Sequence, residues 1–177
     1  MRFPNGQEML DDMGIRDVVR REWPVPILTL GLLAGGAVAG RPDDPTYYRS
    51  LKQAPFAPPS WAFGPAWTIA KLGASAAAVR AARSVRGRDR RTLTALAAAD
   101  AAIFVTFSFV YFRKRSPVLA AVWTVADAAV TAAALPLLAR NDRAAAAGLI
   151  PQAAWLALAT PTGIYQALAN PDPYLGN

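Results

Sequence analysis

The chain has 177 residues, of which 54% are hydrophobic, and a formal net charge of +7. A length of this order suits a single domain. Because the sequence contains no cysteine and no histidine, disulfides, thiolate chemistry and imidazole metal ligands are excluded.

The stretch 1–23 is mixed in charge and lacks the short apolar core of a signal peptide, so we expect a cytoplasmic tail without a cleavable leader. Five apolar segments follow, each of roughly 17–26 residues and thus long enough for a helix to cross a bilayer. They show neither the alternation of strands nor the polar stripes of soluble helices. We therefore predict an all-α fold, a five-transmembrane-helix bundle over residues 24–170, with a C-terminal tail over 171–177. The predicted spans are 24–40, 61–82, 93–112, 117–139 and 144–169.

Positive charges are distributed unequally between the two sets of connecting segments. The tail, the segment 80–91 and the segment 140–143 together hold twelve Lys and Arg residues, against six in 41–52, 113–115 and the stretch beyond 169. Cytoplasmic loops of membrane proteins are enriched in these residues. We therefore expect a multi-pass integral membrane protein with a cytoplasmic N-terminus and a C-terminus outside.

Three ionisable residues, Lys71, Asp100 and Asp127, lie in the middle of predicted spans. Counted from the predicted helix ends, each lies very roughly 12–18 Å from the cytoplasmic face. Charges at such depth are costly and usually face the bundle interior in pairs. We expect an intramembrane ion pair, with Asp127 as the first partner of Lys71 and Asp100 as the alternative. In the other interpretation, Lys71 meets a ligand carboxylate at the floor of a pocket.

The densest stretch of the chain is YYRSLKQAPFAPPSWAFGPAWT, residues 47–68. Its prolines stiffen the loop, and Pro58, Pro59 and Ser60 form a favourable helix start. Trp61 suits the aromatic belt at the membrane interface, which needs no ligand role, whereas Trp67 lies about two turns deeper. The aromatic side chains around this helix start are Tyr47, Tyr48, Phe56, Trp61, Phe63 and Trp67.

This stretch resembles the pattern W/Y-Y-x-x-L-x-K-P-x-F/W-x-P-P-x-W-x-F-G-P-x-W-T of the TspO/MBR family, the tryptophan-rich sensory proteins related to the mitochondrial translocator protein. The fifth predicted span is similar to the family signature P-Y-x-x-W-x-x-F-A through Pro151, Trp155 and Ala159. The residues that match the first pattern are Tyr47, Tyr48, Leu51, Phe56, Pro58, Pro59, Trp61, Phe63, Gly64, Pro65, Trp67 and Thr68.

The chain also departs from the family patterns. Gln53 and Ala54 replace the Lys-Pro of the loop, and Lys71 stands where a tyrosine usually follows. The third span lacks the family's Asn and Trp, and Gln152 replaces the tyrosine of the fifth-span signature. These differences indicate a divergent member.

The resemblance implies a five-helix bundle, usually dimeric, that binds a tetrapyrrole such as protoporphyrin IX beneath the first loop, for transport or sensing. A flat apolar ring with carboxylate tails suits aromatic faces and cations at the rim. Arg49 and Lys52 of the loop are expected to meet the carboxylates. The ligand-binding residues expected on this basis are Tyr48, Phe56, Trp61 near the entrance, Phe63, Trp67, Trp155 and Ala159.

Other function classes remain open beside ligand binding. One is a membrane enzyme that degrades or modifies porphyrin or an isoprenoid-like substrate, and another is a structural or regulatory membrane partner without a small ligand. Without histidine, a free-base porphyrin is a better candidate than haem, and no cofactor is required. A cholesterol motif is rejected because no basic residue follows Tyr165 or Tyr174. We predict no catalytic residue, no metal site and no nucleic-acid partner, but contacts with membrane lipid and with a second copy of the chain.

Overall fold

The computed structural model describes residues 23–39 and 46–176, and in this part of the chain every regular element is a helix. The predicted all-α class is thereby confirmed. The short elements are α4 (Tyr47–Ser50) and η1 (Phe109–Arg113), a π-helix that continues α6. The predicted tail at 1–22 lies outside the described residues, as do residues 40–45 of the first loop. The long helices are α3 (Pro24–Ala39), α5 (Ser60–Ser84), α6 (Gly87–Ser108), α7 (Pro117–Asn141) and α8 (Arg143–Ala169).

Three helices of the described part are long and apolar enough to cross a membrane: α6 together with η1, α7 and α8. Helix α3 is apolar but has only 16 residues. Helix α5 has 25 residues, among them Lys71 and Arg80. These charges lower its hydropathy, so length and composition alone identify fewer spans than the five that the sequence predicts.

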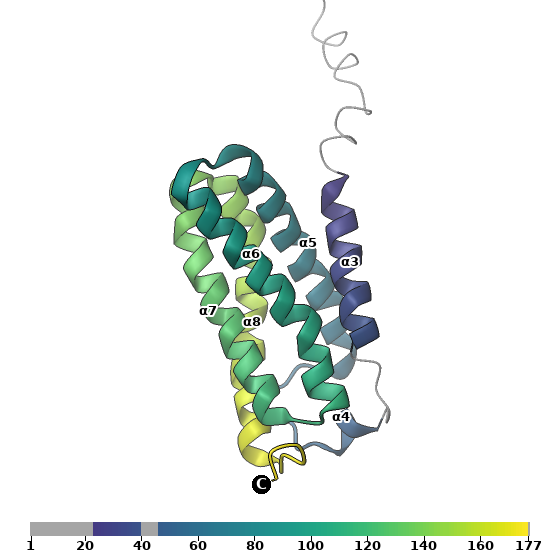
Figure 1. Ribbon diagram of the computed structural model, residues 1–177. Coiled ribbons are helices and arrows are strands. Elements are labelled where there is room, and N and C mark those ends of the chain that lie inside the picture. Colours follow the sequence, from purple (N-terminus) through teal and green to yellow (C-terminus); the bar gives the residue numbers. More distant parts are fainter. Residues whose placement is uncertain (1–22, 40–45, 177) are drawn as a thin grey trace, which may run out of the picture.

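The long helices pack side by side around a common interior (Figure 1). Helix α8 packs against α5 and α7, α6 packs against α7, and α3 packs against α5 and α6. The connections α5–α6 and α7–α8 lie at one end of the bundle, whereas α4, the turn after η1 and the C-terminal end lie at the other. We call the first the basic end and the second the loop end.

Local sequence signals explain where several helices begin. Helix α7 starts at Pro117, and the hydroxyl of Ser116 accepts a hydrogen bond from the Leu119 N–H at 3.1 Å. Helix α8 starts after Asp142, whose carboxylate accepts from the N–H groups of Ala144 and Ala145. Helix α6 starts at Gly87, which has a φ of 64°, a left-handed conformation that glycine adopts without strain.

Glycines allow two pairs of helices to approach closely. A Cβ atom on Gly73 of α5 would overlap the carbonyl oxygen of Gly148 on α8, so the backbones of these helices touch at this point. On α3, Gly35 faces Val105 and Gly36 faces Phe104, both on α6. Small residues at helix contacts are a common device of membrane bundles.

Candidate ligand-binding site

Aromatic side chains from α4, α5, α6 and α8 meet near the loop end of the bundle. We call Tyr48, Phe63, Trp67, Phe104 and Trp155 the aromatic cluster. The ring centroids of Trp67 and Trp155 are 6.1 Å apart, those of Phe63 and Trp155 5.3 Å, and those of Trp67 and Phe104 5.4 Å. Tyr48 joins at 6.0 Å from Phe63. The structure thus brings together four of the expected ligand-binding residues and adds Phe104.

Lys71 lies directly beside this cluster and is fully buried. Its Nζ atom is 5.4 Å from the ring centroid of Trp67 and 4.7 Å from that of Phe104. At these distances the ammonium group is attracted by both aromatic faces. The rings therefore stabilise the buried cation as well as one another.

Among the described residues, the carboxylate closest to Lys71 is that of Asp100, at 2.7 Å, whereas that of Asp127 lies 3.8 Å away. The prediction that Asp127 is the first partner of Lys71 was therefore wrong, because Asp100 is closer. Both carboxylates nevertheless lie within ion-pair distance. Helix α6 follows α5 through a short connection, and Lys71 precedes that connection by as many residues as Asp100 follows it. The two residues consequently lie at the same depth on neighbouring helices.

A glutamine completes this group of polar side chains. The amide of Gln152 donates to Asp100 at 2.5 Å and to the hydroxyl of Thr131 at 2.9 Å. We call Lys71, Asp100, Asp127, Thr131 and Gln152 the charged layer. It contains two carboxylates and one cation, all buried, and it crosses the bundle interior between the loop end and the basic end.

A chain of amide and hydroxyl groups holds the first loop against the bundle. The Tyr111 hydroxyl donates to Gln166 at 2.9 Å, and the Gln166 amide donates to Gln53 at 2.5 Å. The Gln53 amide in turn donates to the Tyr48 carbonyl at 2.9 Å. Sequence reasoning missed Gln166 and Tyr111 as anchors of the loop, because a glutamine on an apolar helix carries no distinctive signal.

The C-terminal end is fastened to the same region. Asn170 accepts from the Lys52 N–H at 2.7 Å and donates to the Lys52 carbonyl at 3.1 Å. Asp172 accepts from the Ser116 hydroxyl at 2.5 Å and from the Val118 N–H at 3.1 Å. Burial raises the pKa of Asp172, but hydrogen bonds from Ser116 and from backbone N–H groups outweigh it, so the net pKa is lowered.

The remaining expected residues make none of the ring contacts within the aromatic cluster. Trp61 is 75% exposed, which suits a position at the bundle surface. Phe56 is also exposed and packs edge-on against Tyr165, with centroids 6.5 Å apart. Arg49 and Lys52 are exposed in the first loop, and Ala159 is half-buried on α8.

The family model described as TspO/MBR family matches residues 24–166, which include the cluster, the charged layer and most of the bundle. The chain belongs to the TspO/MBR family. No curated protein was found to match it. Membership in the TspO/MBR family, together with the three long apolar helices, identifies an integral membrane protein.

The departures from the TspO/MBR patterns now have structural counterparts. Gln53 replaces the lysine of the family loop and accepts a hydrogen bond from Gln166. Lys71 replaces a family tyrosine, and its counter-ion Asp100 lies on the next helix. Gln152, which also replaces a tyrosine, binds that same carboxylate. The three substitutions therefore form polar contacts within the bundle.

One buried polar atom in the aromatic cluster is left without a partner. The indole Nε1 of Trp155 is buried and has no hydrogen-bond acceptor within the described part of the chain. A buried donor without an acceptor costs free energy, which a ligand oxygen would recover. The cluster thus offers apolar ring surface, one free N–H donor and a cation beneath.

Proposed function

We propose that this protein binds a tetrapyrrole, or a flat apolar ligand like it, among the aromatic side chains beneath the first loop, for transport or sensing. The observation that carries the proposal is the Trp67–Trp155 pair, with ring centroids 6.1 Å apart on facing helices. The two indole planes lie 78° apart, and a large flat ring gains favourable contacts with such side chains both by stacking and edge-to-face. The free indole N–H of Trp155 would bind an oxygen of the ligand.

Charge complementarity supports a ligand with carboxylate tails. Arg49 and Lys52 are exposed on the loop above the cluster, where they can reach substituents at the rim of the ring. Charge-assisted hydrogen bonds to carboxylates are stronger than neutral ones. Because Lys71 is already bound to Asp100, the loop cations rather than Lys71 are the proposed partners of the carboxylates.

The proposal is tested by titrating detergent-purified protein with protoporphyrin IX and following tryptophan fluorescence. We expect saturable quenching with a Kd in the micromolar range or below. Trp67→Phe should weaken binding about tenfold, since one good aromatic contact contributes on the order of 1 kcal/mol. Trp23→Phe is the matched control, because Trp23 is exposed just before α3 and is not among the expected ligand-binding residues. Quenching that rises without saturation would contradict the proposal.

The same titration separates binding from modification. If the porphyrin absorbance decays under illumination, and the decay requires Trp67 and Trp155, the protein acts as a membrane enzyme on porphyrin. If the absorbance shifts but stays constant, it binds without chemistry. We expect the second result.

We further propose five membrane spans, α3 and α5–α8, with the N-terminus in the cytoplasm and pairs of chains forming a dimer. The basic end carries the arginines of the α5–α6 and α7–α8 connections, and positive loops favour the cytoplasmic side. Since the chain has no cysteine, Ser84→Cys provides one unique thiol. It should resist an impermeant thiol reagent in intact cells and react after lysis, and reaction in intact cells would reverse the orientation.

A further inference from the structure

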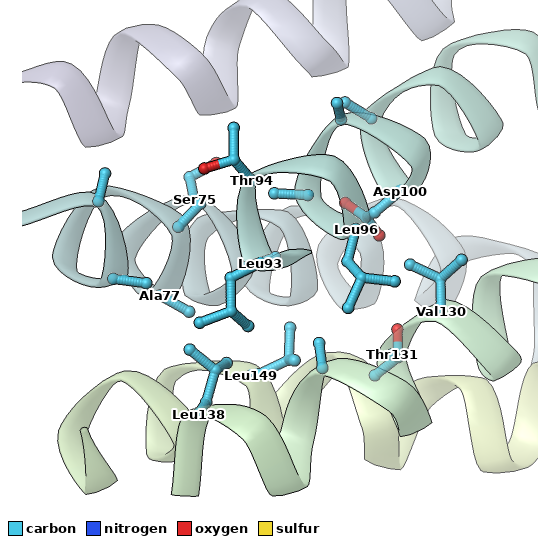
Figure 2. Close-up of a pocket in the computed structure, with 18 of the residues that line it drawn as sticks. Ser75, Ala77, Leu93, Thr94, Leu96, Asp100, Val130, Thr131, Leu138 and Leu149 are labelled. Carbon is cyan, nitrogen blue, oxygen red and sulfur yellow. The ribbon is translucent and has the colours of Figure 1, made fainter. Parts of the chain in front are cut away.

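A cavity of about 350 Å³ lies on the other side of the charged layer, toward the basic end (Figure 2). Its wall consists mainly of alanine and leucine side chains, such as Ala77, Leu93, Leu138 and Leu149. The close-up shows side chains from several helices pointing into this space. The volume falls at the lower end of the range of about 300–1,000 Å³ that is typical of small-molecule sites.

The mouth of the cavity can be located from the exposure of the residues that line it. The exposed ones belong to α3, α5 and α6: Leu28, Ala82, Arg90, Thr94 and Ala98. The lining residues on α7 and α8 are buried or half-buried. The cavity therefore opens along the seam between α5 and α6, beside α3. In an integral membrane protein, this seam faces the lipid.

The two ends of the cavity differ in their polar groups. Arg90, at the mouth, is exposed near the basic end. At the inner end, Asp100 and Gln152 of the charged layer form the floor. The hydroxyl of Ser75 and the side-chain carbonyl of Gln152 are buried there without a hydrogen-bond partner among residues 23–39 and 46–176. The apolar space is thus bounded by a cation outside and by polar groups inside.

The depth of the cavity matches one leaflet of a bilayer. Asp100 follows Arg90 by ten positions on α6, which corresponds to roughly 15 Å at 1.5 Å per residue. The hydrocarbon core of a bilayer is about 30 Å thick. An extended chain of one leaflet can therefore occupy the cavity while its head stays at the level of Arg90.

We propose that this cavity binds a free fatty acid, with its chain among the alanine and leucine side chains and its carboxylate on Arg90. The small volume favours one chain over the two of a phospholipid. The guanidinium group can bind a carboxylate through two parallel hydrogen bonds. The lateral mouth lets the chain enter directly from the membrane. This site is separate from the aromatic cluster, because the charged layer lies between them.

The proposal is tested on the full chain in nanodiscs of zwitterionic lipid, with dodecanoic acid that carries a diazirine at the chain end. After illumination, mass mapping should place the label on lining residues of α5, α6 or α7. Labelling should saturate and should be competed by dodecanoate, but not by its methyl ester. Arg90→Gln should weaken labelling about tenfold, given the strength of hydrogen bonds to charged groups. Arg88→Gln, exposed on the same turn and outside the lining, should not.

Filling the cavity provides an independent test. Ala97→Leu places a larger side chain in the cavity and should reduce labelling about tenfold or more, whereas Ala95→Leu, exposed on the same helix, should leave it unchanged. Ala134→Leu fills the cavity from the α7 side and should reduce labelling as Ala97→Leu does. Thermal unfolding of each variant checks that the fold is kept.

Several results would overturn the proposal. Labelling that does not saturate, or that persists in both folded filled variants, would show that the chain does not enter the cavity. Equal competition by the methyl ester would show that the carboxylate is not bound. Displacement of the probe by anionic phospholipid in the nanodisc would assign the site to a phospholipid headgroup instead of a free acid.

Discussion

The two halves of the bundle interior, on either side of the charged layer, are built from the same helices but filled differently. At the loop end, aromatic rings of α5, α6 and α8 meet at centroid distances of 5.3–6.1 Å. At the basic end, α5 contributes Ala74, Ala77 and Ala81, and a cavity of about 350 Å³ remains. The interior thus carries bulky aromatic rings toward the loop end and small alanine side chains beside the cavity toward the basic end.

The largest expected effect comes from the charged layer that divides the halves. Lys71→Met should lower the free energy of unfolding in detergent by about 3–5 kcal/mol, because it leaves two buried carboxylates without their cation. Adding Asp100→Asn should recover part of the lost stability. Thermal unfolding of the single and the double variant measures the difference in stability.

The matched control for this cycle is Lys52→Met, since Lys52 is exposed and uses only its backbone in hydrogen bonds. It should change stability by less than about 0.5 kcal/mol. Strictly additive effects of Lys71→Met and Asp100→Asn would show that the ion pair contributes nothing to the free energy of unfolding. The two halves of the interior would then differ only in their packing.

A second comparison uses two buried alanines on the same face of α7. Ala120 packs with Tyr47, Leu51 and Tyr111 at the loop end, whereas Ala134 lines the cavity. Ala120→Leu should therefore destabilise the protein by about 1–3 kcal/mol through overpacking. Ala134→Leu should leave the melting temperature unchanged or raise it. Equal losses in both variants would mean that the two halves are equally tight.

The smallest expected effect concerns the basic end at acid pH. Arg80 donates to Asp142 at 2.8 Å and, with other hydrogen bonds, lowers the pKa of Asp142 to about 2. A lowered carboxyl pKa stabilises the fold above the unfolded-state pKa of about 3.9, and this contribution is lost as pH falls through about 2. Arg80→Gln should reduce the melting temperature slightly at pH 5 and by less at pH 2. A loss of the same size at both values would assign the role of Arg80 to packing.

Hydropathy, which follows from residue type along one chain, predicted the helical class and the positions of the long helices. The resemblance to the TspO/MBR patterns assigned Trp67 and Trp155 to one ligand site. The loop motif carries specific information because its prolines and aromatic residues fix the approach to α5. Of the site residues, Phe56 and Trp61 were placed with the ligand by motif alone, and the structure has them exposed.

Other features depend on distances between helices, which the sequence does not state. Which carboxylate lies closer to Lys71 depends on where each helix ends. Counting residues from the α5–α6 connection, rather than from the predicted span limits, would have favoured Asp100 as the closer one. The cavity is a matter of volume, and runs of alanine predict tight packing as readily as a hollow. The link from Gln53 to Gln166 joins residues far apart in the chain by ordinary amides.

The contact between Gly73 and Gly148 fixes more than the spacing of two backbones. Trp67 precedes the first glycine and Trp155 follows the second by nearly the same number of residues, on antiparallel helices. The glycine contact therefore sets the sliding register of α5 against α8, and with it the separation of the two indoles. The fluorescence of the two tryptophans should therefore report changes in this register. We expect Gly73→Ala to alter tryptophan fluorescence although it touches neither indole.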